Sequence, residues 1–324
     1  MIEISDIQRA AERLRGKVVC TPLLESDWLN NSLGGRVLFK AECLQRTGSF
    51  KIRGATNKLS SLDENERQRG VVAYSSGNHA QGVAAAAKLM GISARIVMPR
   101  DVPEIKLANT RAYGASVVLY ERETEDREAI TSEIARQEGL GIIPPYNDEL
   151  IIAGQGTVGL EILQQLQQDT IRADAILCPC GGGGLIAGVA TAIKSSMPEI
   201  EIFAVEPQGF DDTRRSLLAG ERLANTPGMR SICDAIVTPT PGALTFEINQ
   251  KLLAGGLAVS DIAVVEAMVT AFTRLKLVVE PGGSVGLAAL MSGAYPLDGK
   301  TVVVILSGGN MDIKSLTEFQ KLLD

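Results

Sequence analysis

Short apolar runs and longer helical patterns alternate through the middle of the chain. The apolar runs cover 71–74, 94–98 and 116–120 and have the length of buried strands. Patterns with apolar residues at helical spacing cover 78–90, 103–113 and 125–138. Strands and helices that alternate in this way form a parallel sheet with right-handed crossovers. We therefore predict a small α/β domain over 66–148, inserted into the rest of the chain.

The residues on either side of this insert repeat the scheme. Strand patterns cover 36–40, 175–179, 200–205 and 301–306, and helical patterns cover 51–59, 151–166, 185–195 and 261–275. The run 301–306 is almost purely β-branched, which is typical of a strand buried on both faces. We predict a larger domain from 1–65 plus 149–324. The fold class is α/β, with two open, twisted, mostly parallel sheets flanked by helices. The stretch 209–242 has the weakest pattern.

Composition narrows the class of protein. The chain has 324 residues, of which 45% are hydrophobic and 22% charged, as in a globular protein large enough for two lobes. Its net charge of −6 argues against a nucleic-acid surface. No apolar run reaches the ~18 residues of a membrane span, and the first residues do not resemble a secretory signal. Five cysteines at irregular spacing predict reduced thiols and a cytoplasmic location.

The lysine at position 51 lies between an aromatic and an aliphatic residue, Phe50 and Ile52. Burying an ammonium group is costly unless it loses its proton or forms a covalent bond. A lysine with a lowered pKa is a nucleophile that forms Schiff bases. Because most lysines are solvated, the pattern alone is also compatible with an ordinary surface residue.

Four consecutive glycines, 181–184, follow a predicted strand and open a predicted helix. Glycines let a ligand approach the backbone, and free amides at a helix start favour an anion, so we predict a phosphate site. A competing interpretation exists, because Gly182 to Ala187 fits the dinucleotide fingerprint G-x-G-x-x-A. An acidic residue, Glu206, follows about twenty residues later at the end of a strand. That window alone would predict a nicotinamide-dependent oxidoreductase.

Two further polar stretches end predicted strands. Ser75, Ser76, Gly77 and Asn78 follow 71–74, and Ser307 follows 301–306. Open parallel sheets bind ligands at these carboxyl ends, so both stretches are candidate ligand loops. Asn78 could alternatively be a simple helix N-cap.

The lysine, the asparagine loop, the glycines and the late serine, in this order, resemble the fold type II pyridoxal-phosphate enzymes of the tryptophan-synthase-β type. Within them the chain is most similar to the serine/threonine dehydratase and serine racemase family. The resemblance runs from Thr21 to Asn310. It implies that Lys51 holds pyridoxal 5'-phosphate as a Schiff base.

The resemblance also implies roles for the other motif residues. Those implied to bind the cofactor are Phe50, Lys51, Asn78, Gly181, Gly182, Gly183, Gly184, Leu185 and Ser307, with Asn78 at the ring hydroxyl and Ser307 at the pyridine nitrogen. Those implied to bind the substrate carboxylate are Ser75, Ser76, Asn78 and His79. His79 is the single histidine of the chain, so it is also the only candidate for histidine chemistry.

A divalent-cation site is implied as well. Glu206, the carbonyl of Phe210 and Asp212 match the residues that bind Mg²⁺ or Mn²⁺ in serine racemases and metal-dependent dehydratases. Such ions prefer hard oxygen ligands of this kind. The alternative is a solvated acidic loop. Cys178 and Cys180 are too closely spaced for a zinc knuckle and are interpreted as buried strand residues.

The function implied by the resemblance is elimination and deamination of a 3-hydroxy amino acid to a 2-oxo acid and ammonia. Lys51 would be the general base. A neutral hydroxyl at Ser307 favours elimination over transamination. Threonine, serine and 3-hydroxyaspartate all fit this chemistry.

Three alternatives to an ammonia-lyase stay open. The first is a serine racemase, because Ser76 occupies the position of the second proton carrier in those enzymes. An oxidoreductase and a non-catalytic small-molecule binding protein are the others. We also expect a homodimer, and no isoleucine-binding regulatory domain after Ser307.

Overall fold

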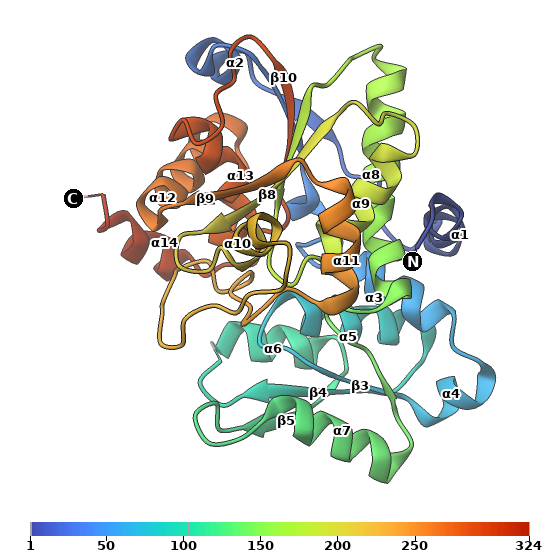
Figure 1. Ribbon diagram of the computed structural model, residues 1–324. Coiled ribbons are helices and arrows are strands. Elements are labelled where there is room, and N and C mark those ends of the chain that lie inside the picture. Colours follow the sequence, from blue (N-terminus) through green and yellow to red (C-terminus); the bar gives the residue numbers. More distant parts are fainter. Residues whose placement is uncertain (1, 103, 324) are drawn as a thin grey trace.

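The computed structural model describes residues 2–102 and 104–323. Its chain forms two lobes, each built on one sheet (Figure 1). The sheet of the smaller lobe has four parallel strands in the order β5–β4–β3–β6. Their bounds are β3 (Val71–Tyr74), β4 (Ala94–Pro99), β5 (Ser116–Tyr120) and β6 (Gly141–Ile142). The first three confirm the predicted strands, whereas β6 is too short to leave a pattern.

Helices cover both faces of this small sheet. They are α5 (Asn78–Met90), α6 (Glu104–Ala112) and α7 (Arg127–Glu138), close to the predicted ranges. The face of Val72 and Val97 packs on α7, and the opposite face packs on α5 and on α3 (Lys51–Ser60) of the larger lobe. The helix α4 (Glu64–Arg69) precedes β3 and buries no residue. The strand–helix alternation of the sequence therefore predicts this lobe well.

The sheet of the larger lobe has six strands in the order β1–β2–β10–β7–β8–β9. They are β1 (Leu23–Glu25), β2 (Arg36–Lys40), β7 (Ala175–Pro179), β8 (Glu201–Pro207), β9 (Gly255–Val259) and β10 (Thr301–Ile305). All neighbours are parallel except β1 and β2. The strand β10 lies between β2 and β7, so the end of the chain completes the centre of the sheet. Its Val302 to Ile305 are fully buried, which confirms burial on both faces.

One face of the large sheet packs on a layer of two helices with three more outside it. These are α8 (Glu149–Gln168) and α9 (Gly184–Lys194), with α1 (Ile4–Leu14), α3 (Lys51–Ser60) and α11 (Ala243–Leu252) packed outside them. The apolar residues of α8 and α9 meet Ile176, Ile202 and Val303 of the sheet. Burying one such side chain contributes about 1.5–3 kcal/mol, so this face is a main source of stability.

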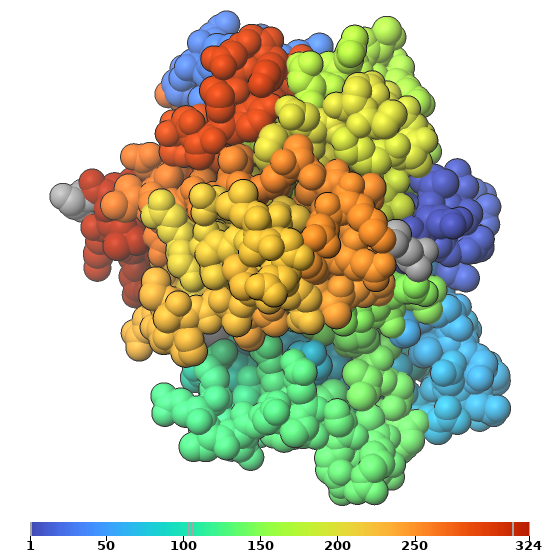
Figure 2. Space-filling model, viewed as in Figure 1, coloured from blue at the N-terminus to red at the C-terminus, as the bar shows by residue number. Residues whose placement is uncertain are grey.

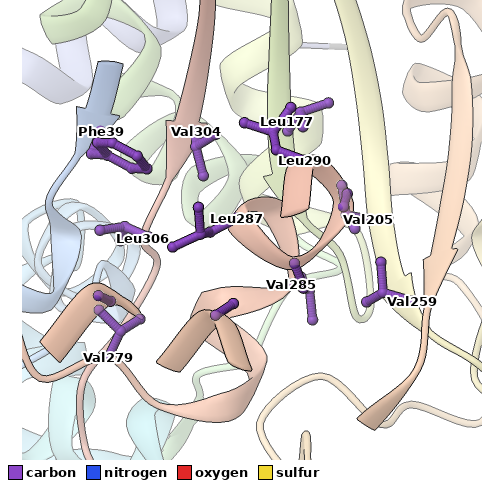
Figure 3. Close-up of a cluster of buried hydrophobic side chains, with 14 of the residues drawn as sticks. Phe39, Leu177, Val205, Val259, Val279, Val285, Leu287, Leu290, Val304 and Leu306 are labelled. Carbon is purple, nitrogen blue, oxygen red and sulfur yellow. The ribbon is translucent and has the colours of Figure 1, made fainter. Parts of the chain in front are cut away.

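The other face packs on α12 (Asp261–Thr270) and α13 (Pro281–Met291). Figure 3 shows Val285, Leu287 and Leu290 of α13 against sheet residues such as Val304. Around them lie α2 (Asp27–Leu33), α14 (Ile313–Gln320) and the short turns η1 (Glu42–Leu44) and η2 (Ala271–Leu275). The helix α10 (Asp212–Ala219) packs on β8 and β9. The predicted helix 261–275 is thus an α-helix to Thr270 followed by a π turn.

The lobes meet along a seam in the space-filling view, bordered by the gold segment that follows α10 (Figure 2). The chain returns to the larger lobe through 144–147, which lies between β6 and α8 and has no regular structure, as the two prolines predict. No helix of the described residues is long and apolar enough to cross a membrane.

Candidate active site

One cavity at the seam between the lobes is lined by every residue predicted to bind cofactor or substrate. They come from the start of α3, from the loops after β3 and β7, and from the end of β10. They are Phe50, Lys51, Ser75, Ser76, Asn78, His79, Gly181, Gly182, Gly183, Gly184, Leu185 and Ser307. The residues after β3, β7 and β10 all follow the carboxyl ends of parallel strands, so two sheets contribute their ligand-binding edges to one cavity.

Lys51 is the first residue of α3. Its Nζ donates a hydrogen bond to the Pro145 carbonyl at 2.8 Å and lies 5.2 Å from the centre of the Phe50 ring. The residue keeps some exposed surface because it faces the cavity, but protein atoms surround its amine. This removal of water lowers the pKa of Lys51 to about 8, so part of the amine is neutral and nucleophilic near physiological pH.

The four glycines form a turn whose backbone donors are free. Gly183 has a φ of 89°, in the left-handed region that favours glycine, and α9 begins at the next residue. The Gly182 carbonyl accepts a 2.6 Å bond from the Thr245 hydroxyl. The amides of Gly181, Gly182 and Gly183 donate to no acceptor among the described residues. Free amides at the start of a helix of this length are a site for an anion such as phosphate.

Asn78 is held by a chain of side chains that the sequence does not reveal. Its Nδ2 donates to Glu280 Oε1 at 2.5 Å, and its Oδ1 accepts from Asn310 Nδ2 at 2.8 Å. Asn310 also donates to the Thr47 carbonyl. The second hydrogen of the Asn78 amide stays available to a ligand. These bonds fix the orientation of the Asn78 side chain. Asn78 is not the N-cap of α5, because that residue is Gly77, which makes no side-chain cap bond.

Glu280 lines the cavity and was missed by sequence reasoning. It precedes α13 and is 3% exposed, at the wall of the cavity. Burial, together with the nearby charge of Asp234, raises the pKa of Glu280 to about 7. No local signal marks it, because it follows an apolar run in a stretch without a recognised motif.

His79 is 2% exposed, and its Nε2 lies 2.9 Å from the Ile143 carbonyl. Burial and the charge of Lys51 lower the pKa of His79 to about 3. The ring is therefore neutral at physiological pH and supplies no positive charge to a carboxylate.

Arg127 and Tyr146 line the same cavity and were also missed. Arg127 is the first residue of α7, half-buried, with its guanidinium 5.2 Å from the centre of the Tyr74 ring. It makes no ion pair within the described part of the chain, in contrast to Lys106, which pairs with Asp234 at 2.6 Å. Arg127 is thus a cation without a protein counter-ion.

Comparison with known proteins settles the family. Residues 14–308 match the family model described as pyridoxal-phosphate dependent enzyme. The chain belongs to this family. It is 43% identical over 310 residues to the L-threo-3-hydroxyaspartate ammonia-lyase of Saccharomyces cerevisiae, covering 95% of this chain and 93% of the relative. It is 41% identical to the serine racemase of Arabidopsis thaliana, covering 97% and 95% of the two chains.

Solved structures agree with the sequence relatives. The T.th. threonine deaminase superposes with a TM-score of 0.91 at 44% identity, covering 96% of this chain and 99% of that one. The maize serine racemase gives a TM-score of 0.92 at 38% identity, covering 99% and 98%. The predicted fold class and the resemblance to the dehydratase and racemase family are therefore confirmed.

The cavity fits pyridoxal phosphate chemically. The free glycine amides suit its phosphate, the Lys51 amine suits its aldehyde, and the free hydrogen of Asn78 suits its ring hydroxyl. Thr238 lines the same cavity, and its buried hydroxyl has no hydrogen-bond partner in the part of the chain that the structure describes. Such an unpartnered donor in the cavity is expected where a ligand completes the hydrogen bonding.

The nicotinamide interpretation of the glycine fingerprint fails on Glu206. Its two carboxylate oxygens accept the backbone amides of Thr213 and Arg214 at 2.9 and 2.8 Å. A ribose-binding acid must face the ligand cavity beside the glycine turn. Glu206 instead caps the first turn of α10 and does not line the cavity.

The predicted metal ligands lie outside the cavity. Glu206 and Asp212 are both fully buried, so the alternative of a solvated acidic loop is wrong. Asp212 Oδ1 accepts from Asn225 at 2.6 Å, whereas its buried Oδ2 has no hydrogen-bond partner among the described residues. Burial raises the pKa of Glu206 well above its usual range and that of Asp212 to about 6. Cys178 and Cys180 are buried as predicted, Cys180 just after β7.

Proposed function

We propose that this protein catalyses the pyridoxal-phosphate-dependent β-elimination and deamination of a 3-hydroxy amino acid, and that its preferred substrate is 3-hydroxyaspartate. The product would be a 2-oxo acid plus ammonia. The reaction class is supported by relatives named as ammonia-lyase and threonine deaminase. The proposed preference for 3-hydroxyaspartate rests on Arg127, a cation in the cavity without an ion pair among the described residues.

The residues of the cavity divide the work. Bound pyridoxal phosphate supplies an electron sink that makes the α-proton of an amino acid acidic. The Lys51 amine, neutral in part because its pKa is low, would accept that proton. The hydroxyls of Ser75 and Ser76 and the Asn78 loop would hold the α-carboxylate. His79, buried and neutral, would keep that loop in place against the Ile143 carbonyl.

The remaining residues of the cavity would orient the cofactor. The amides from Gly181 to Leu185 would hold its phosphate, and Phe50 would lie beside its ring. Ser307, at the end of β10, would face its pyridine nitrogen with a neutral hydroxyl. Closure of the two lobes would exclude water from these groups, which strengthens their electrostatic interactions.

The second carboxylate of 3-hydroxyaspartate would bind Arg127. A guanidinium binds a carboxylate through two charge-assisted hydrogen bonds, which neither serine nor threonine can accept with its side chain. Lys106 is unsuited to this role because Asp234 already neutralises it.

The test is a substrate panel with the variant Arg127→Leu. The wild-type kcat/KM should be highest for L-threo-3-hydroxyaspartate, measured as release of 2-oxo acid. Loss of the guanidinium should lower that kcat/KM about a hundredfold, or ~2.7 kcal/mol, and the value for L-serine less than about threefold. The control is Arg122→Leu, whose arginine pairs with Asp101 on the surface. An equal loss for serine would contradict the proposed specificity.

Serine racemisation is a second candidate function because Ser76 lines the cavity together with Lys51. Two proton carriers in one cavity could serve opposite faces of the substrate. The variant Ser76→Ala should abolish D-serine formation while elimination from L-serine continues. D-Serine formed faster than pyruvate by the wild type would make racemisation the main activity.

A divalent cation, Mg²⁺ or Mn²⁺, is proposed at Glu206, the Phe210 carbonyl and Asp212. It is supported by two buried carboxyl groups and the unpartnered Asp212 Oδ2, a donor set that suits hard cations. Added Mg²⁺ or Mn²⁺ should raise the melting temperature of the wild type and leave that of Asp212→Asn unchanged. Equal effects on both proteins would argue against this site.

The expected homodimer has an exposed apolar band as support. Trp28, Leu44, Phe272 and Val278 are each about half exposed. Arg274, two residues after Phe272, has its guanidinium 3.9 Å from the centre of the Trp28 ring, so α2 and η2 lie side by side. Light scattering should give twice the chain mass, and Phe272→Glu should give the monomer.

The five cysteines are free, in keeping with the proposed cytoplasmic location.

A further inference from the structure

A cluster of four buried charges lies beneath the helix that carries Lys51. Arg53, two residues after Lys51 on α3, is fully buried, as are Lys40 and Glu42, and the side chain of Glu161 is 14% exposed. Two cations face two carboxylates, so the cluster is neutral overall. Its members come from α3, β2, η1 and α8.

Arg53 is the centre of this cluster. Its Nε and Nη2 donate to the two oxygens of Glu42 at 2.8 and 2.7 Å. Its Nη1 and Nη2 donate to the two oxygens of Glu161 at 2.6 and 2.8 Å. Only a planar guanidinium can bind two carboxylates in this forked way. Lys40 then neutralises Glu161 from the other side at 2.7 Å.

Stability alone is a weak reason for such a cluster. Removing charges from water costs several kcal/mol per ion, and well-packed apolar residues often stabilise a protein as much as a buried ion pair does. What the cluster supplies is geometry, because the two forked contacts fix where the first turn of α3 lies relative to η1 and α8.

Close backbone contacts hold the same turn from two sides. A Cβ on Gly82 of α5 would lie 3.0 Å from the Lys51 carbonyl carbon, and a Cβ on Gly154 of α8 would lie 2.6 Å from Gly54 Cα. The Gly54 amide also donates to Gln155 Oε1 at 3.1 Å. The first turn of α3 therefore touches the smaller lobe on one side and the larger lobe on the other.

We propose that Arg53 is a positioning residue for the reaction, which by binding Glu42 and Glu161 holds the first turn of α3 so that the Lys51 amine lies inside the cavity against Pro145. The inference rests on the proposed role of Lys51. Arg53, a residue outside the cavity, would thereby determine how deeply the reactive amine of Lys51 is buried.

The test uses Arg53→Lys in the cofactor-free protein. Lysine keeps the positive charge but cannot bind two carboxylates in forked geometry, so the first turn should shift and hydrate the Lys51 amine. The pH profile of Lys51 acylation by an amine-specific reagent, read by mass spectrometry of its peptide, should move to higher pH. A rise of one pKa unit from about 8 lowers the acylation rate at pH 8 about fivefold. With cofactor bound, kcat should fall and the substrate KM should change little.

The matched control is Lys58→Met on the same helix. Lys58 binds Asp148 at 2.7 Å and links α3 to the start of α8 without touching the first turn. Its loss should leave the acylation profile of Lys51 unchanged.

A lower melting temperature of Arg53→Lys with a wild-type acylation profile would overturn the proposal, because it would show a purely structural role. If Arg53→Lys does not fold, the variant Glu161→Gln replaces it, because it weakens the same contacts with Arg53 at their partly exposed end. A shift of its Lys51 acylation profile to higher pH supports the proposal, and an unchanged profile overturns it. Failure of the proposed role of Lys51 is distinguishable, because the wild-type protein would then not develop colour with pyridoxal phosphate.

Discussion

At the scale of single residues, Glu280 makes the protein sensitive to pH. Its folded-state pKa of about 7 exceeds the ordinary value of 4.5, so between these pH values the folded protein holds a proton that the unfolded chain releases. The associated stability is complete below about pH 4.5 and is lost as the pH rises through 7. We expect Glu280→Gln to raise the free energy of unfolding at pH 8 by up to about 3 kcal/mol, and to change it little at pH 4.5.

Urea denaturation of the cofactor-free protein at both pH values measures this difference. Glutamine can keep the acceptor for the Asn78 amide, so the hydrogen bond need not be lost with the charge. The control is Glu266→Gln on the exposed side of α12, which should show no such pH dependence. A change of the same size at both pH values would mean that Glu280 is not buried as a charge.

Residue-scale predictability depends on how local the signal is. Lys51, Asn78 and the glycines stand in short motifs that carry their own signal, so their meeting in one cavity could be anticipated. Glu280 is 202 positions from its partner Asn78, and Arg127 starts a helix with no motif. Such residues are functional only through what the fold places beside them.

At the scale of elements, the glycine turn must leave room for Tyr146. A Cβ on Gly182 would lie 2.4 Å from the Tyr146 ring. Gly182→Ala should therefore displace the turn or the ring and weaken pyridoxal phosphate binding at least about tenfold, or ~1.4 kcal/mol. Titration of the cofactor-free protein by absorbance gives the Kd.

Gly141→Ala is the matched control, since its Cβ would make only ordinary contacts of 3.7 Å or more, in β6 away from the cavity. It should bind the cofactor like the wild type. Wild-type affinity in Gly182→Ala would show that the turn is not the phosphate site.

The elements that sequence patterns miss are those without an amphipathic period. α13 is apolar or small on every side and forms because the core of the larger lobe surrounds it. β9 begins with two glycines, which weaken a strand pattern. The proposed metal ligands Phe210 and Asp212 lie just before α10 and at its first residue, inside the stretch with the weakest pattern, so burial of Asp212 could not be foreseen.

At the scale of the whole molecule, two lobes and two parallel sheets follow from strand–helix alternation, whereas the contacts between the lobes do not. The domain boundaries at 66 and 148 stay a prediction. The Lys106–Asp234 pair joins α6 of the smaller lobe to the segment after α10 in the larger one, at 2.6 Å. Both residues line the cavity, so this pair spans the seam over which the lobes close.

We expect this pair to favour the closed arrangement of the lobes. Lys106→Glu places two like charges across the seam and should raise the substrate KM several-fold, with a change in unfolding free energy below about 1 kcal/mol because the pair is partly exposed. Steady-state kinetics and urea denaturation measure the two effects. Added salt should weaken the wild-type pair, raising its KM, and should reduce the repulsion in the variant, lowering its KM.

The reversed pair separates closure from direct substrate binding. Lys106→Glu combined with Asp234→Lys restores an attraction across the seam, so its KM should return toward the wild-type value. If Lys106 instead contacted the substrate itself, the double variant would still lack that cation at position 106 and its KM would stay high. A substrate KM of the double variant that is lower than the two single variants predict when their effects are added would identify the pair as a contact that holds the two lobes together.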